Sequence, residues 1–362
     1  MKFYYLLIIF LLISSCKNKN IHKSPDTNHG RGKLQSASAG YDTNGDKKYK
    51  KAFEKFKNKK YNEAYRDFIK LIQKYPDDLE LNYHIGFIAA KSNNFPVAKK
   101  YLLKTISIDK TKWETYRELA ALYKSAYKYK EALKWVKKVF KYEQNDPLSN
   151  FIMAYLSNKL EKNDNANIYY ERAIRATSTY MLAYIHYGEF YFSRKKYAKA
   201  EKIWLEGLKK RYSTTIAQRL GSLYIKTKKY NKAINIYNEL LLKYKNNVEP
   251  YFHIGKIYEL QNNIIKAIEF YQKALSLNPS YNTPKIALAE IYDKQKKYDK
   301  ALKIYRELNE KLIDKTTFYL YKQAVILKKQ KKRNEYLKII KKLKSNTLRQ
   351  SKDYLKLLSK IH

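Results

Sequence analysis

Small residues return at an almost constant interval through most of the chain, and this regularity constrains the fold more than any other feature. One series of alanines recurs every 34 residues with a single interval of 33, and it consists of Ala64, Ala98, Ala132, Ala166, Ala200, Ala233, Ala267 and Ala301. A second series precedes the first by 12 residues and consists of Ala52, Gly86, Ala120, Ala154, Gly188, Gly221, Gly255 and Ala289. Two series in phase predict stacked copies of one small structural unit.

Large residues accompany the small ones at helical spacings. Around Ala200, for example, Tyr197 stands three residues before and Trp204 four residues after. Residues three or four apart share a face of a helix, so each period is expected to contain two amphipathic helices, A and B, joined by a short turn. The small residues predict where the two helices cross closely, and the aromatic residues fill the space on either side. The shorter interval predicts an irregular turn around residues 211–213.

With these paired small and aromatic positions the chain resembles the tetratricopeptide repeat (TPR) family over residues 45–315, and more loosely to 346. The resemblance implies an all-α, right-handed superhelical solenoid of helix-turn-helix repeats. The family's proline after helix B is present only at Pro76 and Pro279, and its helix A tryptophan is replaced by tyrosine in three repeats, at Tyr116, Tyr184 and Tyr251.

The repeat pattern also sets the expected domain boundaries. We expect eight repeats over residues 46–315, followed by a degraded ninth repeat and a C-terminal capping helix over residues 316–362. Glu335 stands where the next alanine would fall, and the last apolar residues, within 347–361, are spaced to cover the end of the stack.

The N-terminus is typical of an exported protein. Lys2 precedes an apolar run of 11 residues, which is too short to span a bilayer, and residues 1–15 are therefore expected to be a signal peptide. The segment Ile13-Ser14-Ser15-Cys16 resembles the lipobox of bacterial lipoproteins, which implies lipidation of Cys16, the chain's single cysteine. Residues 16–45 are polar and lack an apolar period, so they are expected to be the lipidated residue and a flexible tether. Because no acid follows Cys16 closely, the resemblance implies an outer-membrane location facing the periplasm.

The resemblance to TPR proteins also implies that the A helices line a concave groove. The positions that it assigns to the groove hold about as many acids as bases, and several aromatic residues. The expected partner-binding groove comprises Tyr49, Phe53, Phe56, Tyr83, Phe87, Arg117, Phe151, Tyr155, Phe192 and Phe252. Exposed aromatic residues on a concave face indicate contact with a protein or peptide, although several of these residues could instead belong to the core between repeats. The family's carboxylate clamp of Lys and Asn is missing.

The chain is strongly basic, with 76 Lys and Arg against 33 Asp and Glu. Two interpretations of this charge remain open. It can reflect solubility and AT-rich codon usage, or it can give the convex face an attraction for anionic glycan or lipid. The export signal argues against nucleic acid as a partner.

The sequence offers no catalytic or metal-binding constellation. His84, His186 and His253 occupy the same place in different repeats, too far apart in a solenoid to share a metal, and no nucleophile and base are spaced for catalysis. We therefore expect no enzymatic activity, no cofactor and no metal. The leading hypothesis is a membrane-anchored scaffold that helps to assemble or position a protein complex of the envelope, such as secretion, pilus or outer-membrane machinery.

Overall fold

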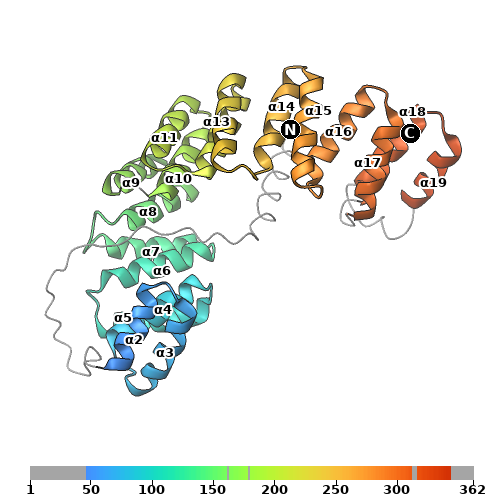
Figure 1. Cartoon of the computed structure of the whole chain (residues 1–362). Coiled ribbons are helices and arrows are strands. Elements are labelled where there is room, and N and C mark those ends of the chain that lie inside the picture. The colour runs from blue at the N-terminus through green and yellow to red at the C-terminus, as the bar shows by residue number, and fades with distance from the viewer. Residues whose placement is uncertain (1–45, 161–162, 178–179, 312–315, 344–362) are drawn as a thin grey trace. The chain divides into compact units, whose positions relative to one another are not determined.

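The computed structural model describes residues 46–160, 163–177, 180–311 and 316–343 (Figure 1). These residues form 18 helices and no strand, which confirms the all-α repeat fold expected from the sequence. They divide into two compact units, unit 1 up to Tyr187 and unit 2 from Gly188, and each unit is considered by itself. The expected signal peptide, Cys16, the tether and the capping helix at 347–361 lie outside the described residues.

Unit 1 consists of successive helix pairs in which each A helix is followed by its B helix. The A helices are α2 (Lys47–Lys57), α4 (Leu79–Lys91), α6 (Trp113–Ser125), α8 (Pro147–Lys159) and the first part of α10 (Met181–Ser193). The B helices are α3 (Tyr61–Lys74), α5 (Phe95–Ile108), α7 (Tyr129–Val139) and α9 (Asn163–Ala176). Successive helices from α2 to α9 pack against each other, and α6 also contacts the A helices α4 and α8. Tyr187 of α10 donates a hydrogen bond to Asn167 of α9 at 2.6 Å.

Unit 2 continues the same alternation. It contains the end of α10 and then α11 (Tyr197–Lys210), α12 (Thr214–Lys226), α13 (Tyr230–Lys243), α14 (Glu249–Leu260), α15 (Ile264–Leu277), α16 (Asn282–Lys294), α17 (Tyr298–Lys311), α18 (Thr316–Lys329) and α19 (Arg333–Leu343). Only residues 211–213 join α11 to α12, whereas four residues, 278–281, join α15 to α16. The single interval of 33 residues therefore arises from the shorter turn at residues 211–213, as the sequence predicted. The last pair, α18 and α19, follows the eight expected repeats.

The two helices of a pair differ in how much of their surface is covered. Helix α4 has the mostly apolar sequence LELNYHIGFIAAK and buries residues on most of its circumference. Helix α3 has the sequence YNEAYRDFIKLIQK, and its four buried residues lie on one face. A helix with apolar residues on a single stripe faces water on the other side, so the B helices form the outer layer and the A helices lie between neighbours.

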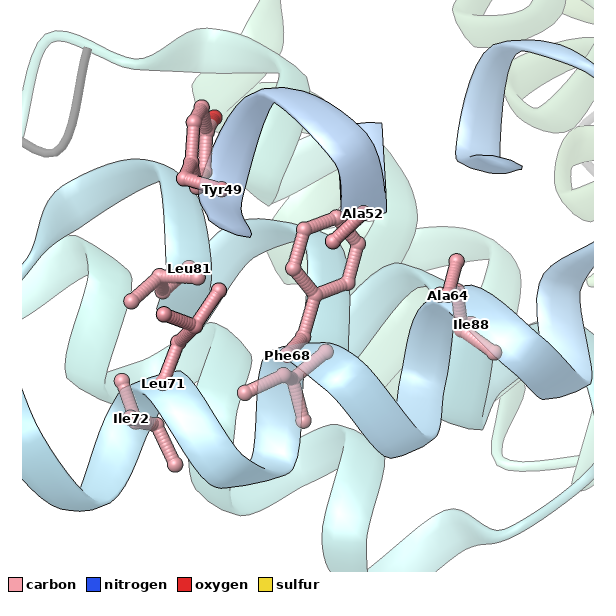
Figure 2. Packing of buried hydrophobic residues seen from close by; sticks show 9 residues of the cluster. Tyr49, Ala52, Ala64, Phe68, Leu71, Ile72, Leu81 and Ile88 are labelled. Atoms are coloured by element: carbon pink, nitrogen blue, oxygen red, sulfur yellow. The ribbon is translucent and has the colours of Figure 1, made fainter. Parts of the chain in front are cut away.

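The alanine series lies at the crossings of the helices, as the sequence predicted. All eight alanines from Ala64 to Ala301 have no exposed surface. In the first pair, Phe68 of α3 points toward Ala52 of α2, and both residues are fully buried (Figure 2). Because both side chains are enclosed, a larger residue at either small position would force the two helices apart.

Four positions of the second series are glycine, and at each of them an added Cβ atom would come within 3 Å of a side chain of the following B helix. A Cβ atom added to Gly188 would lie 2.1 Å from Nε1 of Trp204, and one added to Gly221 would lie 2.4 Å from Cζ of Tyr237. Carbon atoms in ordinary contact are about 3.5–4.0 Å apart. The small residue on the A helix therefore leaves room for a large side chain of the B helix at these crossings.

Every described turn between an A helix and its B helix contains a residue in the left-handed region. These residues are Lys59, Asn93, Tyr127, Lys195, Lys228, Asn262, Lys296 and Lys331, with φ between 56° and 60°. The next residue donates its N–H to a carbonyl five positions earlier, as from Lys229 to Tyr224 at 2.8 Å, which closes the end of the A helix. A left-handed residue at this position lets the chain reverse within three residues.

Candidate functional site: an aromatic and basic face of unit 1

Partly exposed aromatic residues of α2 and α4 form one cluster in unit 1. The cluster consists of Phe53, Phe56, Tyr83 and Phe87, and it surrounds the buried His84. The ring centroid of His84 lies 4.6 Å from that of Phe56 and 5.2 Å from that of Phe53, and Phe56 and Phe87 meet edge to face at 5.5 Å. Edge-to-face packing fixes each ring against its neighbours, so the exposed edges form a preorganised surface.

Lysines lie over the exposed rings of this cluster. Lys57, Lys112 and Lys91 place their Nζ atoms 4.8, 4.8 and 5.1 Å from the ring centroids of Phe53, Tyr83 and Phe87. Lys57 pairs with Glu54 and Lys112 pairs with Glu80, but Lys91 has no carboxylate partner among the residues that the structure describes. The surface therefore combines apolar ring area with ammonium groups held near it.

Side chains of three successive A helices, α6, α8 and α10, form a second cluster. Lys124 of α6 places its Nζ atom 5.1 Å from the ring centroids of both Phe151 and Tyr155. The ring of His186 lies 5.4 Å from Phe151 and 5.7 Å from Tyr155. Burial lowers the pKa of Lys124 below its ordinary value. No carboxylate in the described part of the chain pairs with this ammonium group, so its charge is met only by aromatic rings.

An ion-pair network lies between the two clusters. The guanidinium of Arg117 donates to Glu118 at 2.9 Å and to Asp146 at 3.2 Å, and all three side chains are largely buried. Burial alone would lower the pKa of Arg117, but the charge of Glu118 and the influence of Tyr83 and Asp146 outweigh it and raise the pKa. Asp146 also accepts the N–H of Ser149 at 2.7 Å and so caps α8. Arg117 therefore ties α6 to the start of α8.

His84 is held neutral inside the first cluster. Its Nδ1 atom lies 2.7 Å from the carbonyl oxygen of Glu80, so Nδ1 donates to that oxygen. Burial lowers the pKa of His84 to about 4, and the nearby Glu80 offsets only part of this effect. The imidazole acts as a hydrogen-bonded member of the aromatic packing at neutral pH.

The structure divides the residues expected in the groove into three groups. Tyr49 and Phe151 are buried, so they belong to the core between repeats, which was the alternative that the sequence left open. Six residues are partly exposed on unit 1: Phe53, Phe56, Tyr83, Phe87, Arg117 and Tyr155. Phe192 and Phe252 are partly exposed in unit 2, where Phe192 packs on Trp204 and Phe252 on Tyr271.

Two contributors to these clusters were missed in the sequence. Lys112 and Tyr180 each immediately precede an A helix, yet Lys112 covers Tyr83 and the ring of Tyr180 lies 5.5 Å from that of Phe151. Both residues lie just outside helix A, whereas the sequence predicted the groove residues within it. The same repeat spacing, extended to the residue before each A helix, would have found both.

Two other kinds of site can be compared with the described residues. Among those residues, no three His, Cys, Asp or Glu side chains gather as a metal ion would require. None of the described helices has the length and apolar character needed to cross a bilayer.

Comparison with known proteins agrees with the repeat architecture. Three segments of unit 2, residues 215–242, 248–281 and 286–314, match family models of the tetratricopeptide repeat. The chain contains tetratricopeptide repeats. The TPR matches cover the successive pairs α12–α13, α14–α15 and α16–α17. The same helix alternation and small-residue series extend through unit 1.

A solved TPR structure is similar to the chain in fold. The C-terminal part of a TPR repeat-containing protein from Cytophaga hutchinsonii is 18% identical with a TM-score of 0.53, and the match covers 62% of this chain and 93% of that one. A TPR protein from Parabacteroides merdae is 14% identical, with a TM-score of 0.47 and coverages of 66% and 91%. The pilF protein of Pseudomonas aeruginosa is 15% identical, with a TM-score of 0.45 and coverages of 57% and 94%. No curated protein matches the sequence.

Proposed function

We propose that the chain is a lipid-anchored scaffold of the bacterial envelope that binds a protein partner through the aromatic and basic face of unit 1. The TPR repeats support protein–protein interaction as the general function. The observation that carries the proposal is the pair of aromatic clusters on the A helices, in which rings with exposed edges lie beneath lysines.

The packing of this face favours binding. Interface residues that contribute most to affinity are commonly aromatic, and they contribute more when they lose little freedom on binding. Phe53, Phe56 and Phe87 are held by ring contacts in the free protein. A partner segment with apolar side chains would cover the rings, and its carboxylates would reach Lys91 and Lys124, which have no acidic partner among the described residues.

The expected lipid on Cys16 supports the location in this proposal. A signal peptide would export the chain and the lipid would keep it at the membrane, while the tether of residues 16–45 gives the repeats room to meet a partner. On this basis we place the protein on the periplasmic side of the outer membrane, where it would help to assemble or position an envelope complex.

The partner face is tested by recovery of proteins from membranes of the native host with the tagged chain as bait. A variant with Phe53→Ala, Tyr83→Ala and Phe87→Ala should lose a defined partner that the unaltered chain retains. A variant with Leu242→Ala and Ile265→Ala serves as the matched control, because both residues are exposed apolar residues of unit 2. Equal recovery with both variants would refute the assignment of the face.

A charge-reversal variant separates lost binding from lost folding. Lys57 and Lys91 are exposed, so Lys57→Glu with Lys91→Glu should leave the helical circular dichroism and the unfolding midpoint nearly unchanged. The same partner should be recovered at least tenfold less well, because each reversal repels its carboxylates. In a separate arm, Cys16→Ser should lower the share of the chain that is recovered in the membrane fraction.

A further inference from the structure

The turns between A and B helices give unit 2 a basic edge. We define the basic edge as residues 194–196, 226–229, 294–297 and 328–333, which comprise four turns and the helix ends that they join. The four segments hold three, three, three and five Lys or Arg residues, and none of them holds Asp or Glu. The fifth such turn of unit 2, Gln261-Asn262-Asn263, is uncharged.

These segments lie along one edge of unit 2 because the helices alternate in direction. In each pair of unit 2 the B helix turns back along its A helix after a turn of three residues, so the A–B turns of successive pairs come to the same end of the helices. The opposite end holds fewer bases: residues 211–213, 244–248 and 278–281 contain Arg211 and Lys245, and the ends of α11 and α13 add Lys209, Lys210 and Lys243. Each of the outer helices α11, α13, α15 and α17 mixes bases with at least one acid. Many bases of unit 2 therefore lie on this edge, and some of them pair with acids of adjacent helices, as Lys229 does with Glu201 and Lys332 with Asp299.

Lysine occupies the left-handed position of all four charged turns. Lys195, Lys228, Lys296 and Lys331 have φ between 57° and 59°, where Gly and Asn are the favoured residues. Asn262 occupies the equivalent position in the uncharged turn. Lysine and asparagine are both encoded by adenine-rich codons, so base composition does not explain why lysine stands at the less favourable position.

The ammonium groups of the four left-handed lysines are also accessible to an anionic ligand. All four are exposed, and none has an ion-pair partner in the part of unit 2 that the structure describes. Nearby acids pair instead with other lysines, as Glu201 does with Lys229 at 3.0 Å and Asp293 with Lys329 at 2.7 Å.

Tyrosine follows the lysines in three of the four turns. Tyr197, Tyr230 and Tyr298 begin α11, α13 and α17, and each is partly exposed directly beside a pair of lysines. Tyrosine has an apolar ring and a polar hydroxyl, and it is enriched where a protein meets the headgroup layer of a membrane.

We propose that the basic edge of unit 2 docks on a bilayer that contains anionic phospholipid. A row of exposed lysines with adjacent tyrosines matches an extended anionic surface better than a single small ligand. Docking would act together with the lipid expected on Cys16, because one anchor holds a protein more weakly than two. This inference does not depend on the partner face of unit 1, since docking uses different residues and requires no protein partner.

The test measures binding of the purified full chain, carrying Cys16→Ser, to vesicles. One set of vesicles contains phosphatidylcholine alone, and the other contains phosphatidylcholine with phosphatidylglycerol. The edge variant replaces Lys195, Lys228, Lys296 and Lys331 with Asn, which suits the left-handed position and should not impair folding. The matched control replaces four exposed lysines of outer helices with Gln, namely Lys202, Lys209, Lys210 and Lys303. Both variants lose the same charge.

The proposal predicts that the edge variant binds the anionic vesicles at least tenfold more weakly than the unaltered chain, since each lysine near such a surface contributes about fivefold in affinity. The control should lose much less, and raising the salt concentration should weaken binding by the unaltered chain. Equal losses in the two variants would overturn the proposal. Preference for dextran sulfate or duplex DNA over the anionic vesicles would also overturn it, by assigning the edge to another kind of polyanion.

Discussion

Replacing Gly188 with alanine tests the packing between A and B helices most sharply. The new Cβ would lie 2.1 Å from Nε1 and 2.3 Å from Cε2 of Trp204, whose side chain is 1% exposed. Because the indole is enclosed, it cannot turn into solvent to relieve the overlap. Overpacking of this kind costs about 1–3 kcal/mol, and alanine favours a helix over glycine by about 1 kcal/mol. Since three ring atoms lie within 2.5 Å of the new Cβ, we expect a net destabilisation of about 2 kcal/mol.

The assay is unfolding in urea, followed by helical circular dichroism and by tryptophan fluorescence. Repeat arrays can unfold in more than one step, so the comparison uses the midpoint of the circular dichroism transition, which can be followed with either tryptophan or valine at position 204. The same Gly188→Ala change is then made in a Trp204→Val background, which copies the combination of Ala120 and Val136 found in another repeat.

In the valine background the alanine should be neutral or stabilising by up to about 1 kcal/mol, because only the helical preference remains. A coupling of about 2–3 kcal/mol between the two positions is therefore expected. If Gly188→Ala stabilises the protein equally with tryptophan and with valine at position 204, the small-against-large rule is refuted.

Three further predictions follow from particular residues. Burial lowers the folded-state pKa of His84 to about 4, below the value of about 6.5 for an unfolded chain, so its contribution to stability is fully present above pH 6.5 and is lost as the pH falls toward 4. Protonation of His84 should cost the unaltered chain about 2 kcal/mol of stability between pH 7 and pH 5, and His84→Phe should abolish this loss, as measured by urea unfolding. An unchanged pH dependence would contradict the burial of a neutral imidazole. Arg117→Met should destabilise the protein by about 3–5 kcal/mol at pH 7, because it leaves Glu118 and Asp146 unpaired, and a loss below about 1 kcal/mol would show that the network is dispensable. Lys296→Gly should raise stability by about 1 kcal/mol, since glycine adopts the left-handed conformation without strain, and a lower midpoint would contradict the geometry of that turn.

The sequence predicts the helix pairs and their crossings because small residues at a helix crossing allow few alternatives. Ala64 and Ala267 are enclosed as their spacing required, and the short interval before Ala233 appears as a three-residue turn at 211–213. Repetition makes such predictions strong, because the same close helix crossing requires a small residue in every repeat.

The exposure of single aromatic residues was not predictable in the same way. Phe151 and Tyr155 lie four residues apart on α8, yet Phe151 is buried by Tyr180 and His186 while Tyr155 stays partly exposed. This difference depends on side chains of the following repeat, so it is not visible in the spacing of one helix. Left-handed turns occupied by lysine were also missed, because lysine carries no sequence signal for a positive φ.

The most direct test of the proposed function is photocrosslinking in the native host from a single position on the partner face. Benzoylphenylalanine at Phe87 keeps the aromatic shape of the side chain, and the same group at Leu242, 77% exposed on α13 of unit 2, serves as the control. A scaffold that binds through unit 1 should give a discrete crosslinked protein from position 87 and none of that mass from position 242. The same products from both positions, or none from position 87, would contradict the proposal that this face holds a partner.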